Sequence, residues 1–159
     1  PGTGVSMATS NMTSVRLNAT ATLLGSGKVL VAGGTNVSTT LTSAEIFDPA
    51  TNAFTATTGS MAVPRSQHTA ALLPDGRVLL TGGVRFIPPG PLNTPLQSAE
   101  IFDPAAGTFS SAGAMLTTRY LHQATSLLDG RVLLHGNNGV HEKLPDSSDP
   151  CHQRRGQRQ

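Results

Sequence analysis

The most constraining feature of this sequence is a seven-residue segment that occurs twice without a mismatch. Ser-Ala-Glu-Ile-Phe-Asp-Pro stands at residues 43–49 and again at residues 98–104, so the two copies lie 55 residues apart. A fixed period of about fifty residues indicates a repeat architecture. The similarity also extends beyond this segment: Met61, Arg65, His68, Ala70, residues 75–80 and Gly82 return 54 positions later as Met115, Arg119, His122, Ala124, residues 129–134 and Gly136.

A looser copy of the same unit lies 49 residues upstream of the second one. It retains Met12, Arg16, Ala21, residues 27–30, Gly33 and Gly34. The chain therefore contains the unit about two and a half times. We divide it into a lead-in over residues 1–9, a first unit over 10–58, a second over 59–112, an incomplete third over 113–138, and an irregular, disordered tail over 139–159.

Each unit is expected to form four short strands. In the second unit they are predicted at residues 68–73, 77–81, 98–102 and 108–111, with tight turns at Asp75-Gly76 and after Asp103. The Val-Leu-Leu runs do not alternate apolar with polar residues, which is typical of a sheet buried on both faces. No segment has a helical period, so the sequence predicts an all-β fold.

Several spaced elements together carry a resemblance to a known family. They are the double glycines Gly33-Gly34 and Gly82-Gly83, the Ser-Ala-Glu-x-Phe-Asp-Pro segment, and a Phe seven residues after the Phe of that segment. Over residues 10–137 the chain resembles kelch-repeat β-propellers, most closely the bacterial kelch-like and galactose oxidase-like propeller repeats. The resemblance implies kelch-type β-propeller blades, each a four-stranded antiparallel sheet, in a partial propeller of about two and a half blades. Because propellers close with four to eight blades, closure would need further blades from a longer chain or self-association.

The composition narrows the classes of partner. Charged residues make up 13% of the chain and the formal net charge is +2. The only cluster of basic residues, Arg154, Arg155 and Arg158, lies in the tail, so no nucleic-acid partner is predicted. A single Cys excludes an internal disulfide framework, and no apolar run is long enough to span a membrane. Low charge and abundant hydroxyl residues favour an extracytoplasmic or secreted location.

The strand order places two kinds of connection at one end of each blade. In an up-and-down blade, the loop from the second to the third strand (B–C) and the connection to the next blade (D–A) emerge together. The long, Pro-rich B–C loop at residues 84–93 carries Arg85, Phe86 and Ile87, which we predict as contacts for a partner. The alternative is that Phe86 and Ile87 fold back onto the neighbouring blade.

One arginine recurs in each D–A connection: Arg16, Arg65 and Arg119. Glu45 and Glu100 recur in the same register, and a charge in an apolar strand usually needs a partner. We therefore expect blade-stabilising Arg–Glu pairs, with Gly33, Gly34, Gly82 and Gly83 as further structural residues. The alternative is that Arg65 and Arg119 belong to a ring of arginines that binds an anionic ligand.

His68 and His122 begin the innermost strands, near the expected mouth of the propeller channel. Clustered histidines can bind a metal ion, and His135 and His141 could approach the same mouth. However, the first unit has Ala19 at the matching position. A hydrogen-bonding role within the blades, or a contribution to the binding face, is therefore favoured, and no metal site or cofactor is predicted.

The functional expectation is a propeller segment that acts as a binding scaffold. Its ligand would be a protein or a carbohydrate, bound at the face formed by the B–C and D–A loops. One alternative is a fragment of a secreted, galactose oxidase-like copper oxidase whose ligands lie in missing blades. That family's copper centre uses Tyr and His ligands and a Tyr joined to Cys, whereas Tyr120 and Cys151 are the only residues of their kinds here. The resemblance thus carries the scaffold without the site. No catalytic residues are assigned, and a third alternative is an inactive, truncated remnant.

Overall fold

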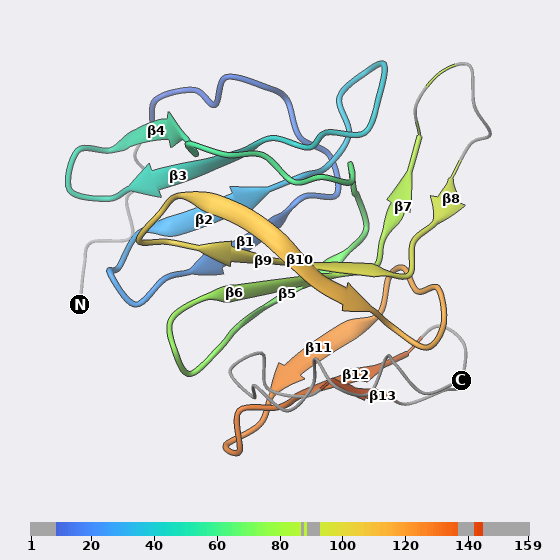
Figure 1. The fold of residues 1–159 in the computed structure, drawn as a ribbon. Helices are drawn as coiled ribbons and strands as arrows, with labels where there is room; N and C mark the ends of the chain where they lie inside the picture. The colour runs from blue at the N-terminus through green and yellow to red at the C-terminus, as the bar shows by residue number, and fades with distance from the viewer. Residues whose placement is uncertain (1–8, 87, 89–92, 137–141, 145–159) are drawn as a thin grey trace.

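The computed structural model describes residues 9–86, 88, 93–136 and 142–144, and these residues form antiparallel sheets with no helix among them (Figure 1). Three sheets follow one another along the chain. Blade 1 consists of β1 (Thr20–Leu23), β2 (Val29–Ala32), β3 (Ala44–Asp48) and β4 (Ala53–Ala56). Blade 2 consists of β5 (Thr69–Leu72), β6 (Val78–Thr81), β9 (Ser98–Asp103) and β10 (Thr108–Ala114). Blade 3 contains β11 (Gln123–Ser126), β12 (Val132–His135) and β13 (Glu142–Leu144).

Within each blade, strands adjacent in the sheet pair antiparallel, and the innermost strand β5 contacts both β1 and β11. The expected all-β fold of propeller blades is therefore confirmed. The long B–C loop of blade 2 adds a small hairpin of β7 (Val84–Arg85) and β8 (Thr94–Pro95). At the end of blade 2, β10 continues to Ala114 instead of stopping at residue 111, and a register shift between Ser111 and Ala114 marks an irregularity in the strand.

The strand β13 corrects one sequence-based expectation. No third Ser-Ala-Glu segment is present, so the sequence predicts an irregular tail from residue 139, yet residues 142–144 pair antiparallel with β12. Strand pairing uses backbone N–H and C=O groups, which nearly every residue supplies, so the strand forms without the repeated side chains. The other residues of the predicted tail lie outside the described part of the chain.

The hydrophobic core lies between the blades. One cluster, which includes Leu30, Val78 and Phe102, joins blades 1 and 2. A second, which includes Leu79 and Leu134, joins blades 2 and 3. All four residues of β6 are buried, whereas β2 and β12 alternate between buried and half-buried residues. Among the three described blades, the second strand is therefore completely buried only in blade 2, which has a neighbouring blade on each side.

The double glycines allow adjacent blades to approach closely. A Cβ atom on Gly33 would overlap the carbonyl oxygen of Arg65, and one on Gly82 would overlap that of Arg119, each from the next blade's D–A connection. The amide of Gly83 donates to the same Arg119 oxygen at 2.7 Å. Both first glycines have positive φ, +63° and +59°, which other residues adopt at a cost. Backbone without a side chain at these two positions thus permits the close packing of adjacent blades.

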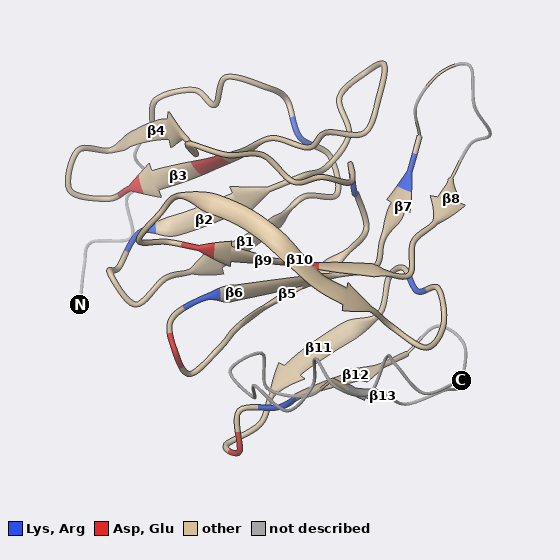
Figure 2. Ribbon diagram, in the orientation of Figure 1, with Lys and Arg blue, Asp and Glu red and all other residues tan. Residues whose placement is uncertain are grey.

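Charged residues are sparse and dispersed. In Figure 2, Lys and Arg positions are scattered over the described ribbon instead of gathering on one face. Among the described residues, no helix is long and apolar enough to cross a membrane.

Candidate binding face

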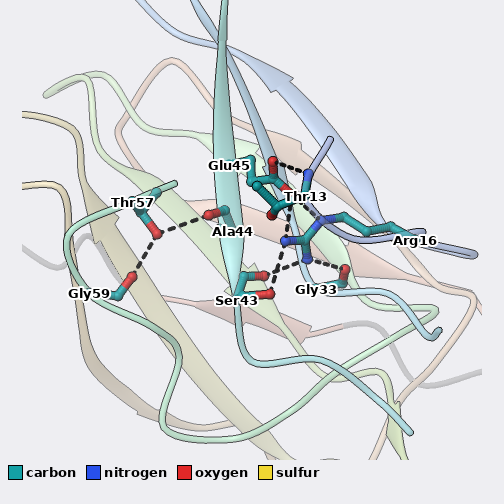
Figure 3. A network of polar contacts seen from close by, with 8 residues as sticks. All are labelled: Thr13, Arg16, Gly33, Ser43, Ala44, Glu45, Thr57 and Gly59. Carbon is teal, nitrogen blue, oxygen red and sulfur yellow. Dashed lines mark hydrogen bonds and ion pairs between the residues drawn. The ribbon is translucent and has the colours of Figure 1, made fainter. Parts of the chain in front are cut away.

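Arg16 and Arg65 each anchor their D–A connection to the third strand of the blade that follows it. The Arg16 guanidinium pairs with Glu45 at 3.0 Å, and it also donates to the carbonyls of Gly33 at 3.0 Å and Ser43 at 2.8 Å. Figure 3 shows these residues and their contacts. The Thr13 amide donates to the second oxygen of Glu45. Burial opposes ionisation, but the hydrogen bonds from Thr13 and Arg16 hold the pKa of Glu45 below its ordinary value. The carboxylate is therefore charged and fully engaged.

The same network recurs one blade later. Arg65 pairs with Glu100 at 2.8 Å and donates to the carbonyls of Gly82 and Ser98 at 2.8 and 3.0 Å. The side chains of Arg65 and Glu100 are 0% and 4% exposed, and Arg119 is also buried. An anionic ligand would have to displace Glu100 to reach Arg65. These contacts favour the structural alternative for the recurring arginines over a ligand-binding ring.

The two repeated histidines connect adjacent blades. His68 shares a hydrogen bond of 2.9 Å between its Nε2 and the Thr20 hydroxyl of blade 1. His122 has the equivalent contact of 3.0 Å to the Thr81 hydroxyl of blade 2. Among the described residues, the Nδ1 atom of each ring has no hydrogen-bond partner. Each ring is thus held at a blade–blade interface by one side-chain contact.

Their surroundings keep both histidines neutral. Burial, followed by the charges of Arg65 and His122, lowers the pKa of His68 to about 3. Burial, followed by Arg119 and His135, lowers the pKa of His122 to about 4. At neutral pH each imidazole therefore acts as an uncharged hydrogen-bonding group.

The long B–C loop of blade 2 forms hydrogen bonds with blade 1. Phe86 donates its amide proton to the Thr40 hydroxyl at 2.8 Å, and the Thr40 amide donates back to the Phe86 carbonyl at 3.0 Å. Arg85 is exposed, whereas Phe86 is half-buried. The backbone at Phe86 thus contacts the neighbouring blade, while Arg85 remains on the surface. The predicted contact Ile87 lies outside the described residues.

Two features at the end of the blades that carries the B–C and D–A connections were not predicted. Val37, in the B–C loop of blade 1, is 99% exposed. A ladder of backbone hydrogen bonds also crosses the blades, from the Gln67 amide to the Asn18 carbonyl at 3.0 Å and from the Leu121 amide to the Gln67 carbonyl at 2.9 Å. All three ladder residues have φ between +52° and +56°, unusual for non-glycine residues. Their equivalent repeat positions, each directly before Ala19, His68 or His122, were the signal that could have revealed the ladder.

The structure also has a hollow at the opposite end of the blades. Its volume is about 260 Å³ and it lies between residues 24–26, 75–77 and 103–105. These are turns between strands, and none of the predicted binding residues is among them. The predicted contacts and this hollow therefore belong to different surfaces of the molecule.

Comparisons with known proteins identify the fold. A family model described as the Kelch motif matches residues 17–58. Among solved structures, a fungal alcohol oxidase of the AA5 family in complex with copper superposes with a TM-score of 0.65 at 21% identity. The match covers 76% of this chain but 27% of the oxidase chain, so the present chain spans about a quarter of that protein. No curated protein sequence matches the chain significantly.

The copper of that oxidase has no counterpart in the donors described here. No group of three or more His, Cys, Asp or Glu side chains in the described ranges is arranged to hold a metal ion. His68 and His122 each use Nε2 for a threonine hydroxyl of the preceding blade. At 21% identity, the likeness to the oxidase concerns the fold. The recurring strands, the motif match and the superposition together identify the chain as a series of kelch-type β-propeller blades.

Proposed function

We propose that this kelch-type scaffold binds a protein or a carbohydrate through the face formed by its B–C and D–A loops, with Arg85 and Phe86 as contacts. The observation that carries the proposal is the anchored base of the long loop. The hairpin of β7 and β8 extends from blade 2, and two hydrogen bonds connect Phe86 to Thr40 of blade 1. A loop held at its base loses less conformational entropy when a ligand binds.

The chemistry of the loop suits such a ligand. Arg85 offers a charged fork of hydrogen-bond donors, and Phe86 offers a half-exposed aromatic surface beside it. Planar donors and aromatic rings are frequent in the central part of protein interfaces. Hydroxyl-rich sugars can use the same pair of groups. Low overall charge supports an extracytoplasmic location for this interaction, as part of the same proposal.

The test uses a defined set of probes. The chain is screened by biolayer interferometry against immobilised oligosaccharides and a displayed-peptide library, and the best binder is titrated. Arg85→Ala and Phe86→Ala are expected to weaken its binding about tenfold or more, as for truncated interface anchors. Arg77→Ala, at the opposite end of the blades, serves as the matched control.

The outcomes separate the site from the function. Unchanged binding by both loop variants, with an unchanged circular dichroism spectrum, would reject the assigned face. Absence of binding to every probe would count against the scaffold function itself.

A further inference from the structure

The outer face of blade 1 is apolar, and no other described blade packs on it. The equivalent face of blade 2 is covered by blade 1. Cross-strand pairing places Leu23 beside Val29, and Val29 beside Phe47, on this outer face. Seven residues of the first unit occupy the repeat positions concerned: Met12, Ala21, Leu23, Val29, Val31, Phe47 and Phe54. Their counterparts in blade 2 all lie in the core between blades 1 and 2: Met61, Ala70, Leu72, Val78, Leu80, Phe102 and Phe109.

The burial of equivalent residues shows what is missing. Met61 is 3% exposed because it packs against the preceding blade, where its Cε lies 3.3 Å from the position of a Cβ on Gly33. Met12, at the same repeat position, is 36% exposed, and Leu23 is 64% exposed. The outer face of blade 1 is therefore the same kind of surface that is buried at both existing blade interfaces, and a further blade fits it.

The outer face of blade 3 has the complementary pattern. Leu133 occupies the repeat position of Leu30 and Leu79, which pack against the next blade in the two core clusters. Gly136 occupies the position of Gly33 and Gly82, against which Met61 and Met115 pack. The outer faces of blades 1 and 3 thus carry the two halves of one further interface.

A size exchange supports the match between these two halves. At the existing interfaces the later blade supplies a histidine, His68 or His122, and the earlier blade supplies a smaller residue, Ala32 or Thr81, at the end of its second strand. In the unpaired halves the sizes are reversed. Blade 1 has Ala19 at the histidine position, and blade 3 has His135 at the small-residue position. Each interface, including the one not formed within the chain, would hold a single imidazole.

We propose that two copies of this chain associate head to tail, with blade 3 of each copy packed on the outer face of blade 1 of the other. Each copy supplies two four-stranded blades and a third blade with three described strands, so two copies provide six blade positions, within the four to eight with which propellers close. The two interfaces are equivalent by two-fold rotation, and the closed ring leaves no sheet face unpaired. The occupant of the apolar face is thus a second copy of the chain.

The first experiment measures the oligomeric state by sedimentation equilibrium over a range of concentrations. We expect a reversible dimer of the 16.4 kDa chain. Val31→Asp places a carboxylate on the outer face of blade 1 and should give a monomer, whereas Leu128→Asp, at a fully exposed position in a turn of blade 3, should remain dimeric. Circular dichroism checks that each variant keeps its β structure. A wild-type monomer, a dimeric Val31→Asp protein, or open-ended larger assemblies would overturn the proposal.

The second experiment tests the size exchange directly and does not depend on the folding of Val31→Asp. Ala19→His would place two imidazoles in the new interface, and overpacking should raise the dimer dissociation constant about tenfold or more. Adding His135→Thr should restore the wild-type value, because this double variant reproduces the existing contact between His122 and Thr81. A merely structural effect of the Ala19→His substitution within one chain would not be rescued in this way. Failure of the rescue, or no effect of Ala19→His, would refute the assigned contact.

Discussion

Replacing Glu100 by glutamine removes one charge from blade 2 without creating a cavity. One oxygen of Glu100 accepts hydrogen bonds from Arg65 at 2.8 Å and Val63 at 3.1 Å, and the other accepts one from the Ala62 amide at 2.8 Å. All three partners are donors. In either orientation, the NH₂ group of a glutamine at this position therefore faces an N–H group.

The magnitude follows from the burial of the pair. Arg65 and Glu100 are 0% and 4% exposed, so water cannot replace the lost contact. Leaving one member of a buried ion pair without its counter-charge costs about 3–5 kcal/mol. We expect Glu100→Gln to lower the free energy of unfolding by about that amount. Asp75→Asn is the matched control, because Asp75 and Arg77 form an exposed pair, for which about 1 kcal/mol or less is expected.

Urea denaturation followed by far-ultraviolet circular dichroism measures both variants against the wild type. The chain has no Trp and a single Tyr, so fluorescence is a poor probe. A loss for Glu100→Gln no greater than that for Asp75→Asn would show that the buried network does not hold the blade together, and would refute the structural role assigned to the repeated arginine and glutamate.

Two further predictions concern the same interfaces. Gly82→Ala should destabilise the fold by more than Gly76→Ala: both have positive φ, but an added Cβ meets the Arg119 carbonyl only at Gly82, and equal losses in urea denaturation would contradict the close-packing argument. The pKa values of about 3 for His68 and about 4 for His122 lie below that of an unfolded histidine, about 6.5, so the unfolded state binds more protons in acid. The free energy of unfolding should be highest above pH 6.5 and should decrease as the pH drops towards 4. If these two rings cause the decrease, the loss between pH 6.5 and 5 should be smaller in His68→Gln than in the wild type.

Repetition made much of the fold predictable. Because Arg65 and Glu100 recur in the register of Arg16 and Glu45, the sequence alone indicated that they pair, and the structure contains both pairs. The turn after Asp103 was also predictable, because its side chain accepts a hydrogen bond from the Ala105 amide two residues on. These contacts depend on local chemistry or on the repeat period.

Features without a counterpart in another unit were harder to predict from the sequence. The contact of Phe86 with Thr40 joins loops of different lengths in different blades, so no period predicts it. The strand β13 forms through backbone pairing, and its residues carry no repeated pattern. The threonine partners of His68 and His122 come from different strands, β1 and β6, although the histidines themselves repeat.

The sequence by itself determined the unit: four short strands, their order, the glycine pair and the arginine–glutamate register. These features are encoded within about fifty residues, and the sequence contains more than one copy of them. Only the tertiary structure decided which faces of those units are buried, because burial depends on whether a neighbouring blade is present. Val78 of blade 2 and Val29 of blade 1 occupy the same repeat position, yet the first is fully buried and the second is only half-buried. Residue type and strand order are local properties, whereas the removal of an apolar face from water requires a second surface to pack against it.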